Sequence, residues 1–552
     1  QRAGSREQRK SRMAAAPSPP RRWTTLNFGL LGSALAWLAL PPVGWWPLSW
    51  VAPIPWLLLI RRKELPGRRP YLALWLAGFA FWMATLHWLR LPHAATSIGW
   101  VALSAYLAVY LPIFVGLARM AVHQVGCSLL VAAPTIWAGL EVAQSHMLTG
   151  LNLGTLGHSQ YRWIELIQIS DLCGGYGVSF LIVLVAAAVA RALPLEGARW
   201  TLWPAAPAIA ALAAALVYGH LRMAGEHTRP GLKVALIQGS VDIDMKLDRE
   251  RTKQIYDQYL SLSKQALTEH KDIDLIVWPE TMFRDAMPLY TQDVHAPEGV
   301  EWSKEKLLEI VADHQDLLKG VARRFGVPSL LGMDTVIYGP GVITSHNSAV
   351  LLDEQGKVEG RYDKMRPVMF GEYVPFAQSI PWLYKLTPLE GGLTPGEQPV
   401  SLPVRGGRVA PSICFETFLP HFIRGQVATL REQGEEPDLL VNLTNDGWFW
   451  GSSELDLHLM AGAIRAVECR KPLAVAANTG FSAVIDADGR IVRQGPRREM
   501  AVLVEEIPFD TRTSPYVRIG DVGAGACLLF AISIAGMGGY SLSREKIARR
   551  AT

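Results

Sequence analysis

The 552-residue sequence has little charge: Asp, Glu, Lys and Arg make up 19% of it, whereas a soluble chain usually carries about a quarter. Its five cysteines are too few for a disulfide framework, and it has no internal repeat. It also has no glycine-rich phosphate loop, no dinucleotide fingerprint and no His or Cys cluster at metal-ligand spacing. We therefore expect neither a cofactor nor a metal. These absences exclude disordered, collagen-like and disulfide-stabilised chains.

The little charge that is present is unevenly distributed. Charged residues are nearly absent from long stretches of the first 220 positions and become ordinary from about 230 to 520. The net charge of +5 does not indicate a nucleic-acid partner, because the basic runs flank apolar segments instead of gathering on one folded face. This distribution predicts a membrane protein that carries one large soluble domain.

Apolar segments long enough to cross a bilayer account for the first region. Residues 23–60 hold no charged side chain, and this stretch is too long for one span of about 20 residues. Pro41-Pro42 and the Gly-Trp-Trp-Pro run at 44–47 divide it into a hairpin of two spans. The further candidate spans are Tyr71–Leu89, Ser97–Leu117, Gly126–Leu140, Gly175–Ala190, Trp200–Tyr218 and Val522–Tyr540. The sequence thus predicts seven spans in a membrane domain at 23–220 and an eighth at 522–540.

Basic residues predict the topology of these spans. They gather in the tail at 1–22, after the second and fourth spans, between the sixth and seventh (Arg191 and Arg199), and in the tail at 541–552. All of these loops fall on one side only if the count of eight is right, which makes both tails cytoplasmic. The region at 232–508 follows an odd number of spans, so we expect it on the opposite face.

Within 232–508, strand-like apolar segments alternate with amphipathic helices, which predicts an α/β domain with a sheet covered by helices. Helices are expected over Asp248–Glu269 and Lys304–Phe325, and Asp285–Trp302 between them is expected to be a longer surface loop instead of a mobile lid. The expected strands are Lys233–Gln238, Asp274–Val277, Ala349–Leu352, Val409–Ile413, Leu439–Leu443, Ala474–Ala477 and Ala483–Ile485, the last followed by a turn at Asp488-Gly489.

Three reactive side chains each follow an apolar strand, the place where α/β scaffolds present functional groups. Cys414 is placed as a nucleophile, Glu280 could be its base, and Lys364 could favour the thiolate or hold an oxyanion together with the Phe415 backbone N–H. Taken singly, each has an ordinary alternative: a small core residue for Cys414, a solvated turn for Glu280 and a surface charge for Lys364. Only their combination favours catalysis.

In combination, these residues resemble the nitrilase superfamily, whose catalytic set is Glu, Lys and Cys in that chain order. The resemblance covers about 232–508 and includes Lys233–Gly239, Val441–Phe449, Arg465–Glu468 and Ala477–Gly480. The arrangement of seven spans, domain and one span, with the run at 370–375 (Phe-Gly-Glu-Tyr-Val-Pro), is typical of one branch, the apolipoprotein N-acyltransferases. The resemblance implies a nitrilase-like αββα sandwich beside a multi-pass membrane domain.

The resemblance also implies the chemistry. It predicts an enzyme of the bacterial inner membrane, with its catalytic domain on the periplasmic side. This enzyme moves an acyl chain from a phospholipid, through a thioester on Cys414, to the α-amino group of an apolipoprotein's N-terminal diacylglyceryl-cysteine. In this ping-pong scheme Glu280 is the proton acceptor, and Lys364 and the Phe415 N–H stabilise the oxyanion. The partners are therefore the bilayer and two lipid-bearing substrates.

Two further carboxylates match positions of the family. Glu372 matches a second glutamate that the family places beside the triad, and Glu416 matches an acidic residue after the Cys-aromatic pair. A structural carboxylate bonded to backbone is an equal alternative for Glu416. Two departures from the family are Phe415, where many members have Tyr, and Met245-Lys246-Leu247, where many carry Trp.

Two other functions are weighed against the acyltransferase. One is a membrane-tethered nitrilase-like amidase that hydrolyses a C–N bond with the same triad. The other is a lipid-binding or transport protein with a degenerate domain. Against transport, the spans hold almost no ionisable residue, with Glu141 as the main exception.

Overall fold

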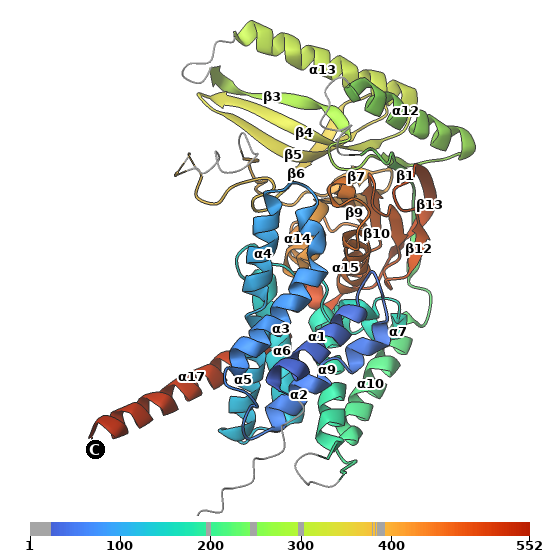
Figure 1. The fold of residues 1–552 in the computed structure, drawn as a ribbon. Helices are drawn as coiled ribbons and strands as arrows, with labels where there is room; N and C mark the ends of the chain where they lie inside the picture. The colour runs from blue at the N-terminus through green and yellow to red at the C-terminus, as the bar shows by residue number, and fades with distance from the viewer. Residues whose placement is uncertain are drawn as a thin grey trace, which may run out of the picture.

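The computed structural model describes residues 24–194, 200–242, 251–295, 303–377, 379–380, 382 and 392–551, with side chains up to residue 538. The basic tail at 1–22, Arg199 and the segment at 245–247 lie outside the described residues, as do the side chains of the tail at 541–552. The described chain forms a helical bundle joined to a two-sheet domain (Figure 1).

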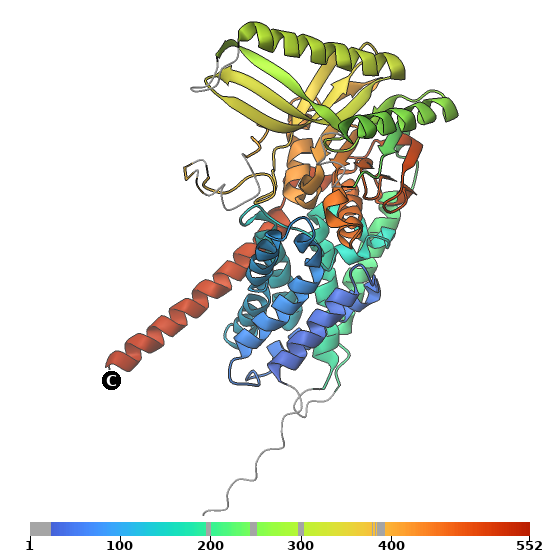
Figure 2. The same cartoon turned by 45° about the horizontal axis from the view of Figure 1, so that its top comes forward.

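The bundle is built from apolar helices that bury one shared core of Leu, Ile, Val and Ala side chains. Its helices are α1 (Thr25–Leu38), α2 (Ile54–Arg61), α3 (Pro70–Thr85), α4 (Thr96–Leu107), α5 (Tyr110–His123), α6 (Leu129–His146), α9 (Gly175–Ala192) and α10 (Ala205–Met223). The last helix, α17 (Val522–Ala551), crosses α6 closely, because a Cβ at Gly139 would come within 2.7 Å of the Cys527 backbone. Beyond this crossing α17 runs away from the bundle in both views (Figures 1 and 2).

The eight predicted spans are only partly recovered. Among the described residues, three helical segments are long and apolar enough to cross a membrane: Thr96–His123, Gly175–Ala192 and Ala205–Met223. The apolar helices at Thr25–Leu38, Pro70–Thr85 and Val522–Gly538 are shorter. The expected second span contains a 3-10 turn at Trp46–Trp50 and the eight-residue α2 instead of one long helix. Prolines 47, 53 and 55 explain this, because Pro cannot continue a helix from its interior.

In the described part of the chain, the first sheet of the second domain has seven strands. Its order is β13 (Ala501–Asp510), β1 (Thr228–Gln238), β2 (Leu275–Val277), β4 (Ser329–Pro340), β5 (Ile343–Leu352) and β6 (Val358–Asp363), and β3 (Phe283–His295) also pairs with β4. β1, β2 and β4 are parallel, with Ala235 opposite Ile276 and Ile276 opposite Ser329. This sheet carries Glu280 after β2 and Lys364 after β6.

Among the described residues, the second sheet has six strands, in the order β12 (Ile491–Gln494), β11 (Ala483–Ile485), β10 (Leu473–Ala477), β9 (Leu439–Thr444), β8 (Gly407–Ile413) and β7 (Leu402–Val404). Here β8, β9 and β10 are parallel. Cys414 follows β8 directly, so the second sheet carries the predicted nucleophile.

The two sheets pack face to face, and each is covered on its outer face by two helices. In β1, Val234 and Leu236 join the core between the sheets, whereas Ala235 and Ile237 join the core under α12 (Thr252–Glu269) and α13 (Lys304–Phe325). This alternation is the two-residue period of a strand. The second sheet is covered by α14 (Pro420–Glu432) and α15 (Glu454–Cys469). The result is the predicted αββα sandwich, with α12 and α13 far from the bundle (Figure 2).

The seven strands expected from the sequence are confirmed, as is the helix at Lys304–Phe325. The helix expected from Asp248 is described from Thr252, and residues 248–250 lie outside the described part. The surface loop expected at 285–302 is wrong over its first half, because residues 283–295 form β3. Met287 is buried there, and Pro288 is tolerated because β3 is an edge strand that pairs only with β4. Residues 296–302 lie outside the described part.

The bundle and the sandwich meet through α15 and the turn after Cys414. Phe418, Leu457 and Met460 pack in one apolar cluster with bundle residues that include Trp82 and Trp88. The second helical layer of the sandwich therefore lies directly against the bundle, and the predicted nucleophile lies at this junction.

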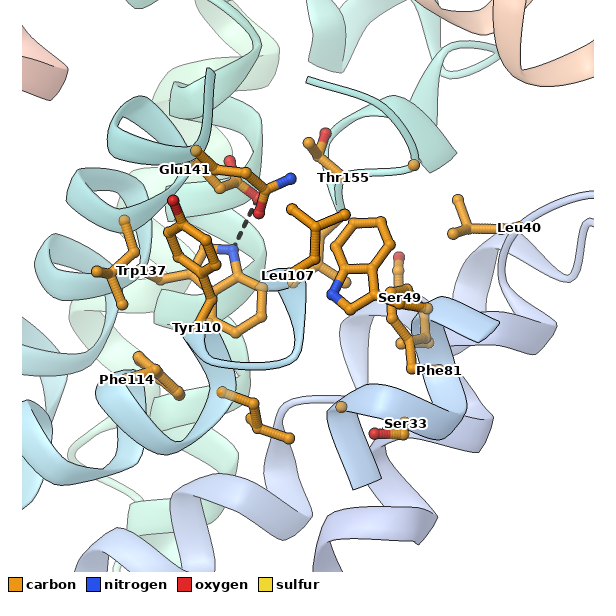
Figure 3. A pocket seen from close by; sticks show the side chains of 18 of the residues that line it. Ser33, Leu40, Ser49, Phe81, Leu107, Tyr110, Phe114, Trp137, Glu141 and Thr155 are labelled. Carbon is orange, nitrogen blue, oxygen red and sulfur yellow. Dashed lines mark hydrogen bonds between the residues drawn. The ribbon is translucent and has the colours of Figure 1, made fainter. Parts of the chain in front are cut away.

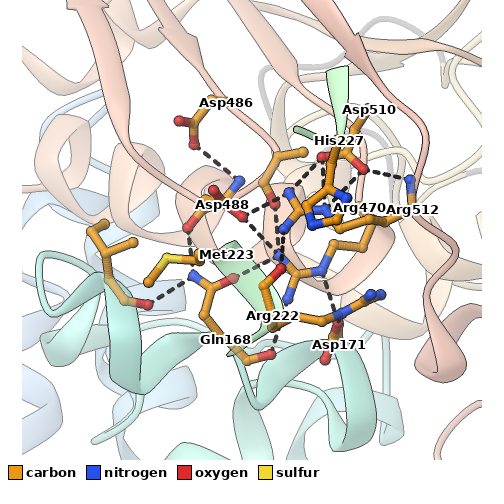
Figure 4. A network of polar contacts seen from close by, with 12 residues as sticks. Gln168, Asp171, Arg222, Met223, His227, Arg470, Asp486, Asp488, Asp510 and Arg512 are labelled. Carbon is orange, nitrogen blue, oxygen red and sulfur yellow. Dashed lines mark hydrogen bonds and ion pairs between the residues drawn. The ribbon is translucent and has the colours of Figure 1, made fainter. Parts of the chain in front are cut away.

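A buried ionic network crosses the same junction (Figure 4). Arg470, at the end of α15, contacts Asp171 of the bundle at 2.7 Å and Asp488 of the sandwich at 3.1 Å. Arg222, at the end of α10, contacts Asp171 at 2.7 Å, and Arg512 contacts Asp488 at 2.7 Å. These pairs fix the sandwich in one orientation on the bundle.

Candidate active site

Glu280 lies between two strands, β2 and β3, that follow one another along β4. β2 ends at Val277 and β3 begins at Phe283, and both run beside β4, so the chain between them turns out of the sheet. Gly332 of β4 permits this turn, because a Cβ there would collide with Pro279 and approach the Glu280 Cα within 2.8 Å. The turn leaves the Glu280 side chain buried and pointing toward other polar groups.

Three donors hold the Glu280 carboxylate. Its Oε1 accepts from Lys364 Nζ at 3.2 Å and from Asn347 Nδ2 at 2.7 Å. Its Oε2 accepts from the Asn445 backbone N–H at 3.0 Å. Asn445 comes from the second sheet, so the base predicted from the sequence is held by both halves of the sandwich.

Lys364 lies between two carboxylates. Its Nζ is 3.2 Å from Glu280 Oε1 and 2.7 Å from Glu372 Oε1, and its side chain is almost fully buried. Burial alone would lower the pKa of Lys364, but the charges of Glu280 and Glu372, with a smaller effect from Cys414, raise it well above its ordinary value. Lys364 is therefore a fixed cation.

Glu372, in the loop after β6, is the second carboxylate that contacts Lys364. Its Oε2 accepts from the Val368 N–H at 2.7 Å, and its Oε1 is 3.5 Å from Asn347 Nδ2 as well as bonded to Lys364. The structure thus brings Glu372 into direct contact with Lys364, and Asn347 lies between the two glutamates.

Cys414 begins a short 3-10 turn directly after β8, in a left-handed backbone conformation with φ +53°. That conformation is unusual for a residue with a side chain, and such positions concentrate at functional sites. Burial and the charge of Glu280 raise the pKa of the Cys414 thiol well above its ordinary value, and the charge of Lys364 opposes them. The thiol is therefore neutral near pH 7 and needs a base to become a nucleophile. Phe415 follows it in the same turn.

Glu416 has the contacts of a structural carboxylate. It is completely buried and accepts hydrogen bonds from the backbone N–H groups of Ile413, Met365 and Arg366 at 2.7, 2.8 and 3.0 Å. The Tyr362 hydroxyl lies 2.8 Å from its Oε2. Burial raises the pKa of Glu416 to about 7, against the opposing effect of these bonds. Glu416 ties the loop after Lys364 to the turn of Cys414.

A second group of ligand-type side chains lies beside this site. Asp446, Glu454 and His458 offer ligand atoms within 4.8 Å of one another, all buried. His458 Nδ1 is 3.4 Å from Asp446 and 3.8 Å from Glu454, and burial raises the pKa of Glu454 well above its ordinary value. Among the described residues, this is the one group with a geometry that could hold a metal ion. No local pattern in the sequence points to this group, since Asp446 lies outside the helix that carries Glu454 and His458.

Two polar residues of the site were missed by sequence reasoning. Asn347, on β5, bonds Glu280 and approaches Glu372, but nothing in its local sequence distinguishes it from any other strand residue. Asn445 lies in the family-like segment Val441–Phe449, but that resemblance does not indicate its role. Its backbone N–H contacts Glu280, and its Oδ1 accepts from Asn478 at 2.9 Å.

An apolar cavity lies inside the bundle on the side of the sandwich (Figure 3). Leu40, Phe81, Leu107, Phe114 and Trp137 line it, with Glu141, Gln144 and Thr155 among its few polar residues. Glu141 accepts a hydrogen bond from Trp137 Nε1 at 2.8 Å. Leu40, Trp82, Leu107 and Leu153 belong both to this lining and to the apolar cluster that contains Phe418, the last residue of the Cys414 turn.

The chain is similar to known proteins over both of its parts. The family model described as apolipoprotein N-acyltransferase N-terminal domain matches residues 32–188, and the one described as carbon-nitrogen hydrolase matches residues 233–514. An apolipoprotein N-acyltransferase of Geobacter metallireducens is 34% identical over 96% of this chain and 98% of its own. That of Rhodopirellula baltica is 29% identical over 94% and 97%. Among solved structures, an amidase from Nesterenkonia sp. is 18% identical over 55% of this chain and 98% of its own, with a TM-score of 0.36.

Proposed function

The chain belongs to the apolipoprotein N-acyltransferase family, and from this premise we propose that it transfers an acyl chain from a phospholipid to the α-amino group of a lipoprotein's diacylglyceryl-cysteine. The observation that carries the proposal is the buried cluster in which Lys364 contacts both Glu280 and Glu372 beside Cys414. A nitrilase-like domain set against an apolar bundle fits lipid substrates better than small soluble amides.

In the first half-reaction Glu280 takes the proton of the Cys414 thiol, and the thiolate attacks the ester carbonyl carbon of the phospholipid. The negative charge that develops on the carbonyl oxygen is stabilised by the fixed cation of Lys364 and by the Phe415 backbone N–H. When the C–O bond breaks, Glu280 returns its proton to the departing alkoxide. The products are a lysophospholipid and an acyl thioester on Cys414.

In the second half-reaction the lipoprotein amine attacks the thioester carbonyl, and Glu280 takes a proton from the nitrogen. The C–S bond breaks, an amide forms, and the thiolate of Cys414 is protonated again. The apolar cavity that shares residues with the cluster around Phe418 offers a place for the transferred chain, since its lining is mostly aliphatic and aromatic. An acyl chain held there would keep water from the thioester and favour aminolysis.

Both substrates are lipid-anchored, so the proposed setting is a bacterial inner membrane spanned by the helical bundle. The basic loops of the sequence support cytoplasmic tails and a periplasmic sandwich. Eight spans, with the domains at 23–220, 232–508 and 522–540, remain the proposed topology. Cysteine accessibility to a membrane-impermeant maleimide, with single cysteines placed in each loop, measures it directly.

The purified full chain in detergent micelles tests the chemistry. Incubation with a phospholipid is expected to add one acyl mass to the peptide that contains Cys414 and to release lysophospholipid. Addition of a diacylglyceryl-cysteine peptide should then move that mass to the peptide amine. The Cys414→Ala variant should do neither, and the matched Cys127→Ala variant should do both. Transfer that persists without Cys414 would contradict the thioester mechanism.

The alternative amidase gives different products. Hydrolysis of a C–N bond would release a free acid with ammonia or an amine, and no lysophospholipid. The membrane-domain match at 32–188 favours the acyltransferase over this alternative. The contacts of Glu280, Lys364 and Glu372 likewise weigh against a degenerate domain.

A further inference from the structure

Four basic side chains meet beside the Cys414 turn, where α6 and α14 come together. His421 and Arg424 lie three residues apart on the first turns of α14 and so share one face. His146 ends α6, and its ring stacks on that of His421 with 4.1 Å between centroids. The Arg366 guanidinium lies over the Phe422 ring, 5.6 Å from its centroid. We call His146, Arg366, His421 and Arg424 the basic cluster.

Little negative charge faces the basic cluster, because Glu468, which interacts electrostatically with Arg424, is already paired with Arg465. Within the described part of the chain, neither Arg366 nor Arg424 forms an ion pair, and the buried Arg424 Nε and His421 Nδ1 have no hydrogen-bond partner. Of the four cluster residues, His146 is the one that lies within ion-pair distance of a carboxylate in the described part of the chain, 3.7 Å from Asp521, which also accepts from the Tyr516 hydroxyl. Buried polar atoms without partners are rare in folded proteins, and each calls for an explanation such as an absent ligand.

The electrostatic surroundings of His421 are consistent with this shortage of negative charge. Burial, followed by the charges of His146, Arg366, Arg465 and Arg424, lowers the pKa of His421 to about 3. Arg465 is paired with Glu468 at 2.8 Å, whereas Arg366 and Arg424 form no ion pair in the described part of the chain. An anion placed here would relieve the repulsion among the remaining groups.

The basic cluster is connected to the reacting centre. The Glu416 carboxylate accepts from the Arg366 N–H at 3.0 Å and from the Ile413 N–H at 2.7 Å, so one side chain ties Arg366 to the residue before Cys414. On the other side, a Cβ at Gly520 would come within 3.2 Å of the Arg424 guanidinium carbon. Gly520 precedes α17, so the cluster lies where the bundle meets the sandwich.

We propose that the basic cluster is a subsite for a phosphate group, either that of the glycerophospholipid donor or free phosphate, beside Cys414. Guanidinium groups bind phosphate oxygens with two parallel hydrogen bonds, and the imidazoles add single ones. In a glycerophospholipid only the three-carbon glycerol separates the phosphate from the ester, so one molecule can contact both places. This inference rests on the proposed function. It predicts that the enzyme prefers phosphate-bearing donors to neutral glycerides.

The test compares two acyl donors with identical chains, phosphatidylglycerol and diacylglycerol, in detergent micelles with the purified full chain. The readout is the rate at which Cys414 gains an acyl mass. We expect Arg424→Gln, and more strongly Arg366→Gln with Arg424→Gln, to raise the phosphatidylglycerol concentration for half-maximal acylation by roughly tenfold or more. Acylation by diacylglycerol should change less than about twofold. Arg424→Lys should recover part of the loss, and Arg323→Gln, on the exposed face of α13, should change nothing.

Inorganic phosphate distinguishes the two sources of the ligand. If it inhibits acylation by phosphatidylglycerol in the unaltered protein but not in the double variant, the subsite also takes free phosphate. If it does not inhibit while the donor-selective loss persists, the ligand is the headgroup alone. An equal loss with both donors, at an unchanged unfolding temperature, would overturn the subsite.

A different result of the same experiment would contradict the proposed function itself and not the phosphate subsite. If the unaltered protein gains no acyl mass from either donor, the acyl-transfer chemistry is wrong. The subsite is then judged by inorganic phosphate alone, which should raise the unfolding temperature of the unaltered protein but not that of the double variant. No shift in either protein would reject it.

Discussion

Two buried ionic clusters of the molecule differ in what their charges face. In the catalytic cluster, Lys364 contacts Glu280 and Glu372 while its surroundings include the thiol of Cys414. In the junction network, Arg470 contacts groups that hold it in place: Asp171, Asp488 and Gln168. The first cluster leaves a reactive group among its charges, whereas the second joins two domains. Burial of ion pairs alone therefore does not indicate a catalytic site.

The largest expected effect separates activity from stability in the catalytic cluster. Glu280→Gln keeps the shape and the acceptor for the Asn445 N–H but removes the base. We expect the rate of thioester formation to fall by roughly 10²–10⁴-fold, the usual range for a lost general base. The unfolding temperature should fall less than in an Arg470→Met variant, because the Gln keeps the shape and the Asn445 contact and Lys364 keeps its contact with Glu372. Mass spectrometry of Cys414 and thermal unfolding measure the two quantities, and a large fall in stability would make Glu280 structural.

The junction network should respond in the opposite way. Arg470→Met leaves Asp171 buried with Arg222 as its remaining cationic contact, and breaking a buried pair costs about 3–5 kcal/mol. Thermal or denaturant unfolding measures this loss. Acylation by the protein that remains folded at low temperature should change less than about twofold.

Arg490→Met is the matched control for that variant. Arg490 contacts the same Asp488 at 2.9 Å, but its side chain is 47% exposed. Solvent screening limits such a pair to about 1 kcal/mol or less. Equal losses for Arg470→Met and Arg490→Met would show that burial does not set the strength of the junction.

Glu416 belongs with the structural contacts, although it lies next to Cys414 and Phe415. In Glu416→Gln, the new NH₂ group faces backbone N–H groups whose hydrogen bonds the carboxylate had accepted. At least one of these N–H groups therefore loses its partner. The expected destabilisation is about 1–3 kcal/mol. Because burial raises the folded pKa of Glu416 to about 7, its ionisation costs stability as pH rises from about 4.5 to 7. The Gln variant should lose that part of the pH dependence, and unfolding curves at several pH values check this.

The smallest expected effect concerns the thiol itself. Because the pKa of Cys414 is raised, its alkylation by a neutral maleimide should accelerate from about pH 7 to pH 9 without a plateau. The charge of Glu280 contributes to that raised pKa, so Glu280→Gln should be alkylated several-fold faster than the unaltered protein at about pH 8 while it transfers acyl chains more slowly. Slower alkylation of the variant would mean that Glu280 assists the thiolate even without a substrate.

Local pattern was sufficient for much of the fold. β1, β8, β9 and β10 are short apolar runs, and their alternation with amphipathic segments predicted an α/β sandwich. β3 was not predicted, because its sequence is mixed and it is stable only where β4 offers a partner. The second span was predicted from hydrophobicity alone, whereas prolines 47, 53 and 55 limit its helix to α2.

The sequence by itself determined which residue types could do chemistry and in what order they occur: Glu280, Lys364 and Cys414, each just after a strand. Only the tertiary structure decided what surrounds them. Asn347 and the Asn445 N–H donate hydrogen bonds to Glu280, and Glu416 accepts one from the Ile413 backbone N–H. The residues of the basic cluster come from α6, α14 and the loop after Lys364. These contacts join residues far apart in the chain, and no local pattern encodes them. They exist because two sheets and a helical bundle bury their apolar faces against one another, which brings the polar ends of several strands and helices to one place.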